Sequence, residues 1–285
     1  MSAGDGFYTV DEIRERLSIS TYAFWMYRPI GEGVLQECAR LGIKQIELFE
    51  SPEQFDMADS ASMRYIGDAC RSCGIEIRSY HAFKTNFSDI DTEADRIARV
   101  DLCRRQIDTM LELGGVLWGS HAGPADATVF KSHEELARHV EGTPAAIAVE
   151  NFSSDGVLLE DRVAFLERID HPQVGLVLDI GHVKNSSGEN PMTLPGGPTR
   201  VLELCGSRLL HLHLHGFKDG RDHHAPLVEG DTIQWVELFR MLRAIGYSGD
   251  INFEPAGPRL NANPVEAVAA APEKIVRMAA AQGTR

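Results

Sequence analysis

The sequence has few cysteines and no long apolar run, and both absences limit what the chain can be. Its five cysteines, an odd number in a chain of 285 residues, predict no disulfide framework. Cys70 and Cys73 form a CxxC pair, but no second pair completes a zinc site, so buried thiols are expected. No segment approaches the roughly 18 uninterrupted apolar residues of a membrane span, and no basic region followed by an apolar one opens the chain. We therefore expect a cytoplasmic protein that does not enter a membrane.

Positive charge is also scarce. Lys and Arg number 28 against 42 Asp and Glu, which gives a net charge of −14. Nucleic acids and anionic membranes are bound through clustered basic residues, so neither is an expected partner. Hydrophobic residues make up 43% of the chain, and no linker or low-complexity block divides it. The sequence predicts one domain over residues 1–285.

Eight strand-like apolar segments alternate with segments of helical spacing, and several of the helical segments stop at a glycine, as at Gly42, Gly74 and Gly246. This alternation and length predict an α/β protein with a (β/α)₈ TIM barrel. A doubly wound open sheet is the alternative, but no GxGxxG motif follows the first strand. The strand-like segments are 17–23, 43–49, 75–81, 116–121, 145–150, 174–179, 209–215 and 250–254.

The segment at 209–216, LLHLHLHG, alternates strictly between leucine and histidine. A period of two is typical of a strand, so the leucines share one face and the histidines the other. Clustered imidazoles make a poor apolar core but good ligands for a divalent cation. A wet strand face with hydrogen-bonded histidines is the alternative interpretation. The histidines of the strand and the polar residues that follow it are His211, His213, His215, Asp222, His223 and His224.

The other predicted strands end in, or carry, ionisable residues of the same kinds. Active sites of (β/α)₈ barrels lie at the carboxyl ends of the strands, so these residues should converge. Several carboxylates close together are tolerated only around a cation. Mixed carboxylate and imidazole ligands suit Mn²⁺, Mg²⁺, Co²⁺ or Zn²⁺. The residues are Glu47, His81, His121, Glu150, Asp179, His182, His213 and Glu254.

Seven short motifs, in order along the chain, resemble those of the xylose isomerase-like TIM-barrel superfamily. They are IELFE, RSYH, GSHAG, AVEN, LDIGH, HLH…DGRDHH…EGD and NFEP, and they span Gly42 to Glu254. The superfamily holds sugar and sugar-phosphate isomerases and epimerases, inosose and dehydroshikimate dehydratases, and apurinic-site endonucleases. The motifs are specific for the superfamily and weak for the reaction.

The resemblance implies a divalent metal ion, Mn²⁺ by preference, with Mg²⁺, Co²⁺ or Zn²⁺ as alternatives. An H-x-x-D pattern selects the histidine ligand in the family; here it selects His213, but Gly216 stands at the acidic position, so His211 and His215 stay open. The implied metal ligands are Glu150, Asp179, His213 and Glu254.

The resemblance also implies how the site works. Two glutamates, Glu150 and Glu254, exchange a proton at the carbon beside a substrate carbonyl, and the cation stabilises the enediolate as a Lewis acid. Trp118 or Phe83 is expected to cover the apolar face of the substrate. The other residues expected to bind substrate are Glu47, His81, His121, His182, Asp222 and His224.

The predicted function is therefore a metal-dependent sugar isomerase or epimerase of carbohydrate metabolism that acts on a ketose or cyclitol. A lyase or dehydratase passes through the same enolate and is the first alternative. A metal-stabilised scaffold or solute-binding subunit is the non-enzymatic alternative. Barrels of this kind often form homo-oligomers, which the sequence neither requires nor excludes.

A second enzymatic alternative is a phosphodiesterase like the apurinic-site endonucleases, which bind three zinc ions. The net charge of −14 and the lack of a basic stripe argue against a nucleic-acid substrate. The residues at positions that match the ligands of those endonucleases are His81, His121, Glu150, Asp179, His182, His213, Asp222, His224 and Glu254.

Overall fold

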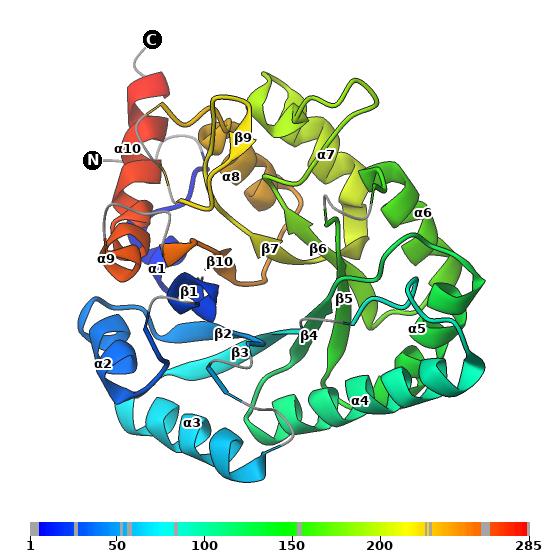
Figure 1. Ribbon diagram of the computed structural model, residues 1–285. Helices are drawn as coiled ribbons and strands as arrows, with labels where there is room; N and C mark the ends of the chain where they lie inside the picture. Colours follow the sequence, from blue (N-terminus) through cyan, green and yellow to red (C-terminus); the bar gives the residue numbers. More distant parts are fainter. Residues whose placement is uncertain are drawn as a thin grey trace.

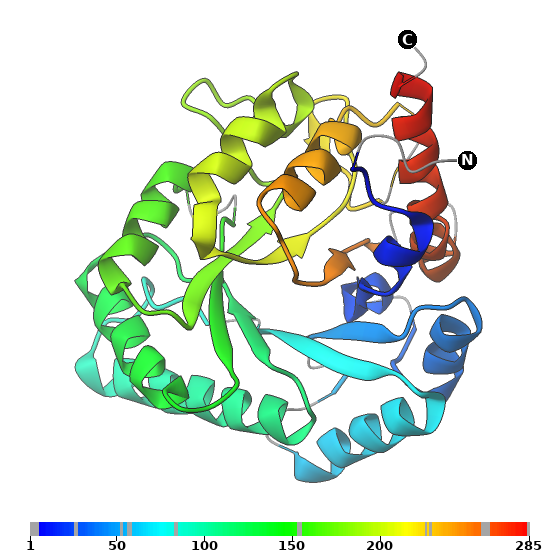
Figure 2. The same ribbon diagram turned by 180° about the vertical axis from the view of Figure 1, so that it is seen from behind.

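The computed structural model describes residues 6–25, 28–51, 54–55, 59–82, 85–152, 156–225, 227, 230–257 and 263–283. Strands and helices alternate along the chain, and the helices surround a ring of strands (Figures 1 and 2). The ring contains β1 (Leu17–Ser20), β2 (Gln45–Phe49), β3 (Glu76–Ala82), β4 (Leu117–Ser120), β5 (Ala146–Glu150), β6 (Val174–Asp179), β7 (Leu209–His213) and β10 (Ile251–Phe253). The helices are α1 (Val10–Arg14), α2 (Glu32–Arg40), α3 (Ser60–Cys73), α4 (Glu93–Glu112), α5 (Ala127–Val140), α6 (Leu159–Ile169), α7 (Gly197–Cys205), α8 (Trp235–Ala244), α9 (Pro264–Ala269) and α10 (Ala271–Gly283).

Parallel pairing joins the strands into a closed ring. The hydrogen-bonded order is β10-β1-β2-β3-β4-β5-β6-β7. The two ends of this order meet where Leu214, directly after β7, pairs with Phe253 of β10. There the Leu214 N–H donates to the carbonyl oxygen of Asn252 over 2.9 Å, and the Glu254 N–H donates to that of Leu214 over 3.0 Å. The fold is the (β/α)₈ TIM barrel that the sequence predicts.

Local sequence signals explain the elements that position the site. Helix α3 begins after Asp59, whose side chain accepts the Ala61 and Ser62 N–H groups, and it ends at Gly74 with φ of 67°. Strand β6, VGLVLD, is buried at every position, as expected for a strand between the barrel interior and the helices. An added Cβ at Gly175 in β6 would lie 2.4 Å from the carbonyl oxygen of Arg208, so glycine there permits close approach of the chain that leads into β7.

The alternation in β7 has the predicted consequence. Leu212 and Leu214 are fully buried in the hydrophobic core. His211 and His213 instead contact Glu47 of β2 across the barrel, at distances of 2.9 and 3.3 Å. The strand therefore presents its imidazoles to the barrel interior and its leucines to the packing around it.

Some element boundaries differ from the prediction. The first strand ends at Ser20 rather than Ala23, because the Ser20 side chain caps a 3₁₀ turn, η1 (Thr21–Phe24). The segment after β7 is not a plain loop: β8 (Phe217–Lys218) and β9 (Arg221–Asp222) form an antiparallel hairpin. Two positive φ angles, 53° at Asp219 and 71° at Gly220, close its turn.

Two further 3₁₀ turns, η3 (Pro191–Thr193) and η4 (Gly206–Arg208), flank α7. Among the described residues, none of the helices combines the length and the apolar character needed to cross a membrane.

Candidate functional site

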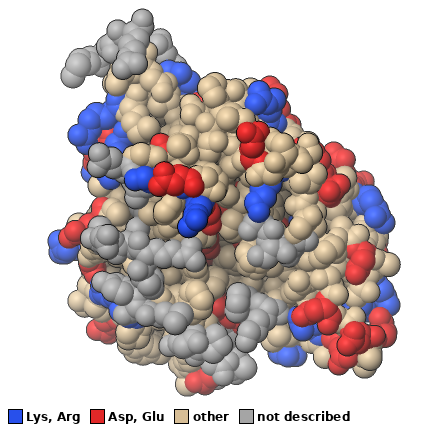
Figure 3. Space-filling view, turned by 45° about the horizontal axis from the view of Figure 1, so that its top comes forward, with Lys and Arg blue, Asp and Glu red and all other residues tan. Residues whose placement is uncertain are grey.

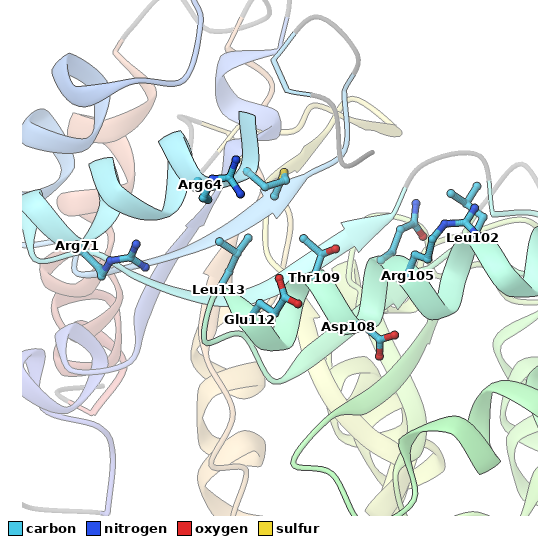
Figure 4. Close-up of a pocket in the computed structure, with 10 residues that line it drawn as sticks. Arg64, Arg71, Leu102, Arg105, Asp108, Thr109, Glu112 and Leu113 are labelled. Atoms are coloured by element: carbon cyan, nitrogen blue, oxygen red, sulfur yellow. The ribbon is translucent and has the colours of Figure 1, made fainter. Parts of the chain in front are cut away.

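A groove of about 510 Å³ lies on the outside of the barrel, between α3 and α4 (Figure 4). Charged side chains from both helices line it, among them Arg64 and Arg71 of α3 and Arg105 and Glu112 of α4. The residues that line it include none of those expected in the active site.

The ionisable residues instead meet at the carboxyl ends of the barrel strands. Glu150 and Asp179 are the last residues of β5 and β6, and His213 is the last residue of β7. Glu254 directly follows β10. All four are buried, with exposed fractions of 3% or less. Four strands therefore deliver the predicted metal ligands to one place.

His213 lies between carboxylates on both sides of its ring. Its Nδ1 atom is 3.3 Å from Glu150 Oε2, 3.6 Å from Glu254 Oε2 and 4.0 Å from Asp179 Oδ2. This buried nitrogen makes no hydrogen bond to any described residue. A buried imidazole nitrogen without a hydrogen bond, facing three carboxylates, is a suitable ligand set for a divalent cation. These residues thus fit the metal that the sequence suggests.

Two histidines flank this cluster on the β3 and β4 side. His81 Nδ1 lies 3.2 Å from Glu254 Oε1, and His121 Nε2 lies 3.1 Å from Glu150 Oε2. The Nε2 atoms of the two histidines are 3.1 Å apart. Both predicted substrate-binding histidines therefore border the carboxylates that they were expected to accompany.

Asp222 of the hairpin binds three imidazoles on the opposite side. Its oxygens lie 2.9 Å from His215 Nδ1, 2.9 Å from His224 Nε2 and 3.3 Å from His182 Nε2. His224 has a φ of 42°, an unusual conformation for a residue with a side chain, and its Nδ1 donates to the carbonyl oxygen of Glu254 over 3.0 Å. The hairpin is thereby tied to the mouth of the barrel.

Asp179 is oriented by His215 and by the backbone. His215 Nε2 lies 2.9 Å from both Asp179 carboxylate oxygens. The N–H groups of Gly181 and His182 donate to Oδ1 over 2.9 Å. An added Cβ at Gly181 would lie only 2.1 Å from His215 Cε1, so the DIGH motif needs glycine for the ring to reach the aspartate. His215 therefore positions Asp179, and its Nε2 faces that carboxylate.

Glu47 does not lie where the sequence placed it. We expected it to bind substrate, but it is fully buried, and two histidines of β7 contact it. In the sheet register it stands opposite Ser79, one layer below the pairing of Phe49 with His81. It therefore lies beneath His213, on the side of the ring away from the other three carboxylates.

Opposite charges shift the ionisation of the whole cluster. Burial alone would raise the pKa of Glu150, but the attraction of His121 and His213 outweighs it and holds that pKa well below its usual value. Burial disfavours the charged form of His182, but Asp179, Asp222 and Glu150 raise its pKa to about 11. The carboxylates therefore demand positive charge, which either protons on the imidazoles or a metal cation can supply.

Trp118 corrects another expectation. We expected its ring over the substrate, but it is completely buried and its Nε1–H donates to Gln106 Oε1 of α4 over 3.3 Å. Its side chain thus points from β4 into the helix layer. Phe83, the other aromatic residue considered for this role, lies outside the described residues.

Other aromatic rings border the histidines, and the sequence analysis did not single them out. Phe152 stacks on His121 with ring centroids 3.9 Å apart. On the other side Tyr22 lies 5.3 Å from His224 and stacks on Trp25 at 5.5 Å. Phe152 directly follows the AVEN motif, and Tyr22 directly follows the first strand, so a search of strand ends for apolar as well as ionisable residues would have found both.

Charge on the outer surface is mixed. On the face shown in Figure 3, Lys and Arg lie scattered among Asp and Glu and form no continuous stripe among the described residues. This pattern offers no extended track for a phosphate backbone.

Comparison with known proteins agrees with this architecture. The model of one family, the xylose isomerase-like TIM barrel, matches residues 35–278. No curated protein matches the sequence significantly.

Solved structures share the fold at low identity. A D-tagatose 3-epimerase-like protein is 19% identical with a TM-score of 0.73, covering 94% of this chain and 99% of its own. D-psicose 3-epimerase from Clostridium cellulolyticum H10, solved with D-tagatose, is 18% identical with a TM-score of 0.67, covering 93% and 98%. A xylose isomerase-like TIM barrel protein from Mycobacterium smegmatis, in complex with magnesium, is 15% identical with a TM-score of 0.70, covering 96% and 99%. Since the family model spans most of the sequence, and the strands close into the corresponding barrel, this chain belongs to the xylose isomerase-like TIM barrel family.

Proposed function

We propose that the protein is a divalent-metal-dependent sugar isomerase or epimerase that removes and returns a proton beside the carbonyl of a ketose or cyclitol. The observation that carries this proposal is the convergence of Glu150 and Glu254 on His213 Nδ1, from β5 and from the end of β10. Relatives of the same fold named D-psicose and D-tagatose 3-epimerases support the substrate class. The preferred metal is Mn²⁺, held by Glu150, Asp179, His213 and Glu254.

The two glutamates divide their oxygens between two tasks. In both, Oε2 lies towards His213 Nδ1. The Oε1 atoms contact other histidines: His182 Nδ1 is 3.0 Å from Glu150 Oε1, and His81 Nδ1 is 3.2 Å from Glu254 Oε1. The Oε1 atoms therefore take and return the substrate proton, and the neighbouring imidazoles hold them in place. A divalent cation bound between the Oε2 atoms supplies Lewis-acid stabilisation of the enediolate.

The surrounding residues orient the sugar. His81, His121, His182 and His224 offer ring nitrogens to its hydroxyl groups, with Asp222 as a further acceptor. Phe152 on one side and Tyr22 with Trp25 on the other provide the apolar surface that we first assigned to Trp118. These rings also exclude water from the reacting carbon.

The test is a screen of ketoses and cyclitols in deuterated water, with the metal content of the protein measured in parallel. We expect close to one ion per chain, and deuterium at the carbon beside the carbonyl, even for sugars that are not converted further. Conversion to an epimer supports the isomerase, whereas loss of water supports the lyase alternative, which passes through the same enolate. Efficient turnover without deuterium at that carbon would refute the two-glutamate mechanism.

A second candidate function, metal-dependent phosphodiester hydrolysis, rests on one specific observation. Besides the cluster of Glu150, Asp179 and His213, two further groups have ligand atoms close enough to hold a metal ion. These groups are His81, His121 and Glu150, and His182, Asp222 and His224. Three ions per chain together with cleavage of DNA at abasic sites would replace the isomerase by this candidate. One ion per chain and intact DNA would exclude it.

A further inference from the structure

We propose that Glu47 is a positioning residue that makes Nδ1, rather than Nε2, the nitrogen by which His213 binds the metal. The inference rests on the metal site proposed above but not on the choice of isomerase, lyase or hydrolase. A neutral imidazole has one N–H and one lone pair, and only the lone pair binds a metal. Whichever nitrogen donates a hydrogen bond is therefore removed from the ligand set.

The surroundings of Glu47 fix its role as an acceptor. Asn252 Nδ2 donates to Oε1 over 3.2 Å, and Ser79 Oγ donates to Oε2 over 3.1 Å. His211 Nε2 lies 2.9 Å from Oε2, and His213 Nε2 lies 3.3 Å from Oε1. An ionised carboxylate offers about four acceptor positions and no donor. Four side-chain donors thus match its capacity, and both histidines keep their proton on Nε2.

The consequence appears on the other side of the His213 ring. With Nε2–H directed at Glu47, the Nδ1 lone pair faces the carboxylates of Glu150, Asp179 and Glu254. That nitrogen is buried and has no hydrogen bond to the described residues. His211, two residues earlier on the same face, contacts the same carboxylate of Glu47. One buried glutamate therefore assigns different roles to two neighbouring histidines.

Glu47→Gln tests the assignment. His213 Nε2 is almost equidistant from the two oxygens, at 3.3 and 3.4 Å, so either orientation of the amide brings an N–H group against it. The imidazole then shifts its proton to Nδ1 and loses the lone pair that faces the carboxylates. We expect the dissociation constant for Mn²⁺ or Zn²⁺, measured by competition with a chelator, to rise about 10- to 100-fold.

Ser79→Ala is the matched control. It removes one neutral donor from the same buried carboxylate but leaves both imidazole contacts, so metal affinity should change by less than about threefold. If Glu47 were merely structural, Glu47→Gln would lower the melting temperature of the metal-free protein, and the folded fraction would bind metal as tightly as wild type. That outcome would overturn the proposal.

Wild-type protein provides a test that does not depend on a variant folding. In cadmium-loaded protein with isotopically labelled histidine, NMR should show coupling between cadmium and His213 Nδ1, with the proton retained on Nε2. Coupling at Nε2 would overturn the proposal. Either NMR result is independent of sugar turnover, so an inactive protein with Nδ1 ligation would refute the proposed function while leaving this role of Glu47 in place.

Discussion

The glycine of the DIGH motif provides the sharpest test of how the site is built. Gly181 lies against the His215 ring, and a Cβ added there would come within 2.1 Å of Cε1. Ordinary contact begins near 3.4 Å, so in Gly181→Ala the ring must retreat by about 1.3 Å, the difference between the two distances. His215 is fully buried and held by Asp179 and Asp222 at 2.9 Å, so it cannot retreat without losing those contacts.

The size of the effect follows from this geometry. Overpacking a buried position costs about 1–3 kcal/mol. For a chain of this size, about 2 kcal/mol corresponds to a fall of roughly 4–8 °C in melting temperature. Asp179 also loses the imidazole that orients it, so metal affinity should fall about tenfold or more.

Calorimetry and a chelator competition assay measure the two effects separately. Gly33→Ala is the control, because an added Cβ at this position in α2 meets nothing within 4 Å. It should leave metal affinity unchanged and keep or slightly raise the melting temperature, since alanine favours a helix. A Gly181→Ala protein with wild-type melting temperature and metal affinity would show that His215 does not hold Asp179 as described.

Further predictions concern the ligands, the proton chemistry, the metal and a buried histidine outside the site. His213→Ala should abolish metal binding, whereas His211→Ala should mainly cost stability; full metal occupancy in the His213 variant, measured by mass spectrometry, would contradict this. Glu150→Gln and Glu254→Gln each keep an oxygen for the metal, so kcat should fall about 100-fold or more while KM changes far less. Chelation should abolish turnover, and restored metal should return it, with circular dichroism unchanged throughout. Burial lowers the pKa of His133 to about 4 from 6.5, so the folded state resists its protonation and loses stability as pH falls from 6.5 towards 4. Relative to His133→Gln in urea unfolding, this loss should reach about 3 kcal/mol near pH 4, and pH-independent differences would refute it.

The barrel and the metal ligands could be predicted because they depend on regular features of the chain. Alternating strands and helices leave few possible folds, and parallel strands bring their carboxyl ends to one edge. Glu150, Asp179 and Glu254 end apolar runs, so their common location required no knowledge of side-chain packing. The choice among the three histidines of β7 needed the family pattern as well, and the contacts of His213 Nδ1 are consistent with it.

Positions that depend on strand parity and register were harder. Trp118 and His121 are three residues apart, an odd number, so in an extended segment they face opposite sides; applying this rule would have excluded Trp118 from the barrel interior. Glu47 has the correct parity, but its depth depends on pairing with Ser79, together with a register shift between Ile46 and Glu47. The Asp219-Gly220 pair is a known hairpin signal, and we had interpreted its glycine only as the end of a strand.

The number of buried acids explains why the site contains so many histidines. Glu47, Glu150, Asp179, Asp222 and Glu254 lie close together, and their mutual repulsion must be balanced. Asp179 and Asp222 raise the pKa of His215 to about 10 despite its burial, so at neutral pH this imidazole is protonated and neutralises part of that charge. The other site histidines whose pKa is raised, such as His182 and His213, act in the same way. A metal ion that binds His213 must then displace a proton, which makes metal affinity increase with pH. The same imidazoles can hold the carboxylates together without the metal, so the chain can keep its fold while the reaction still depends on the cation.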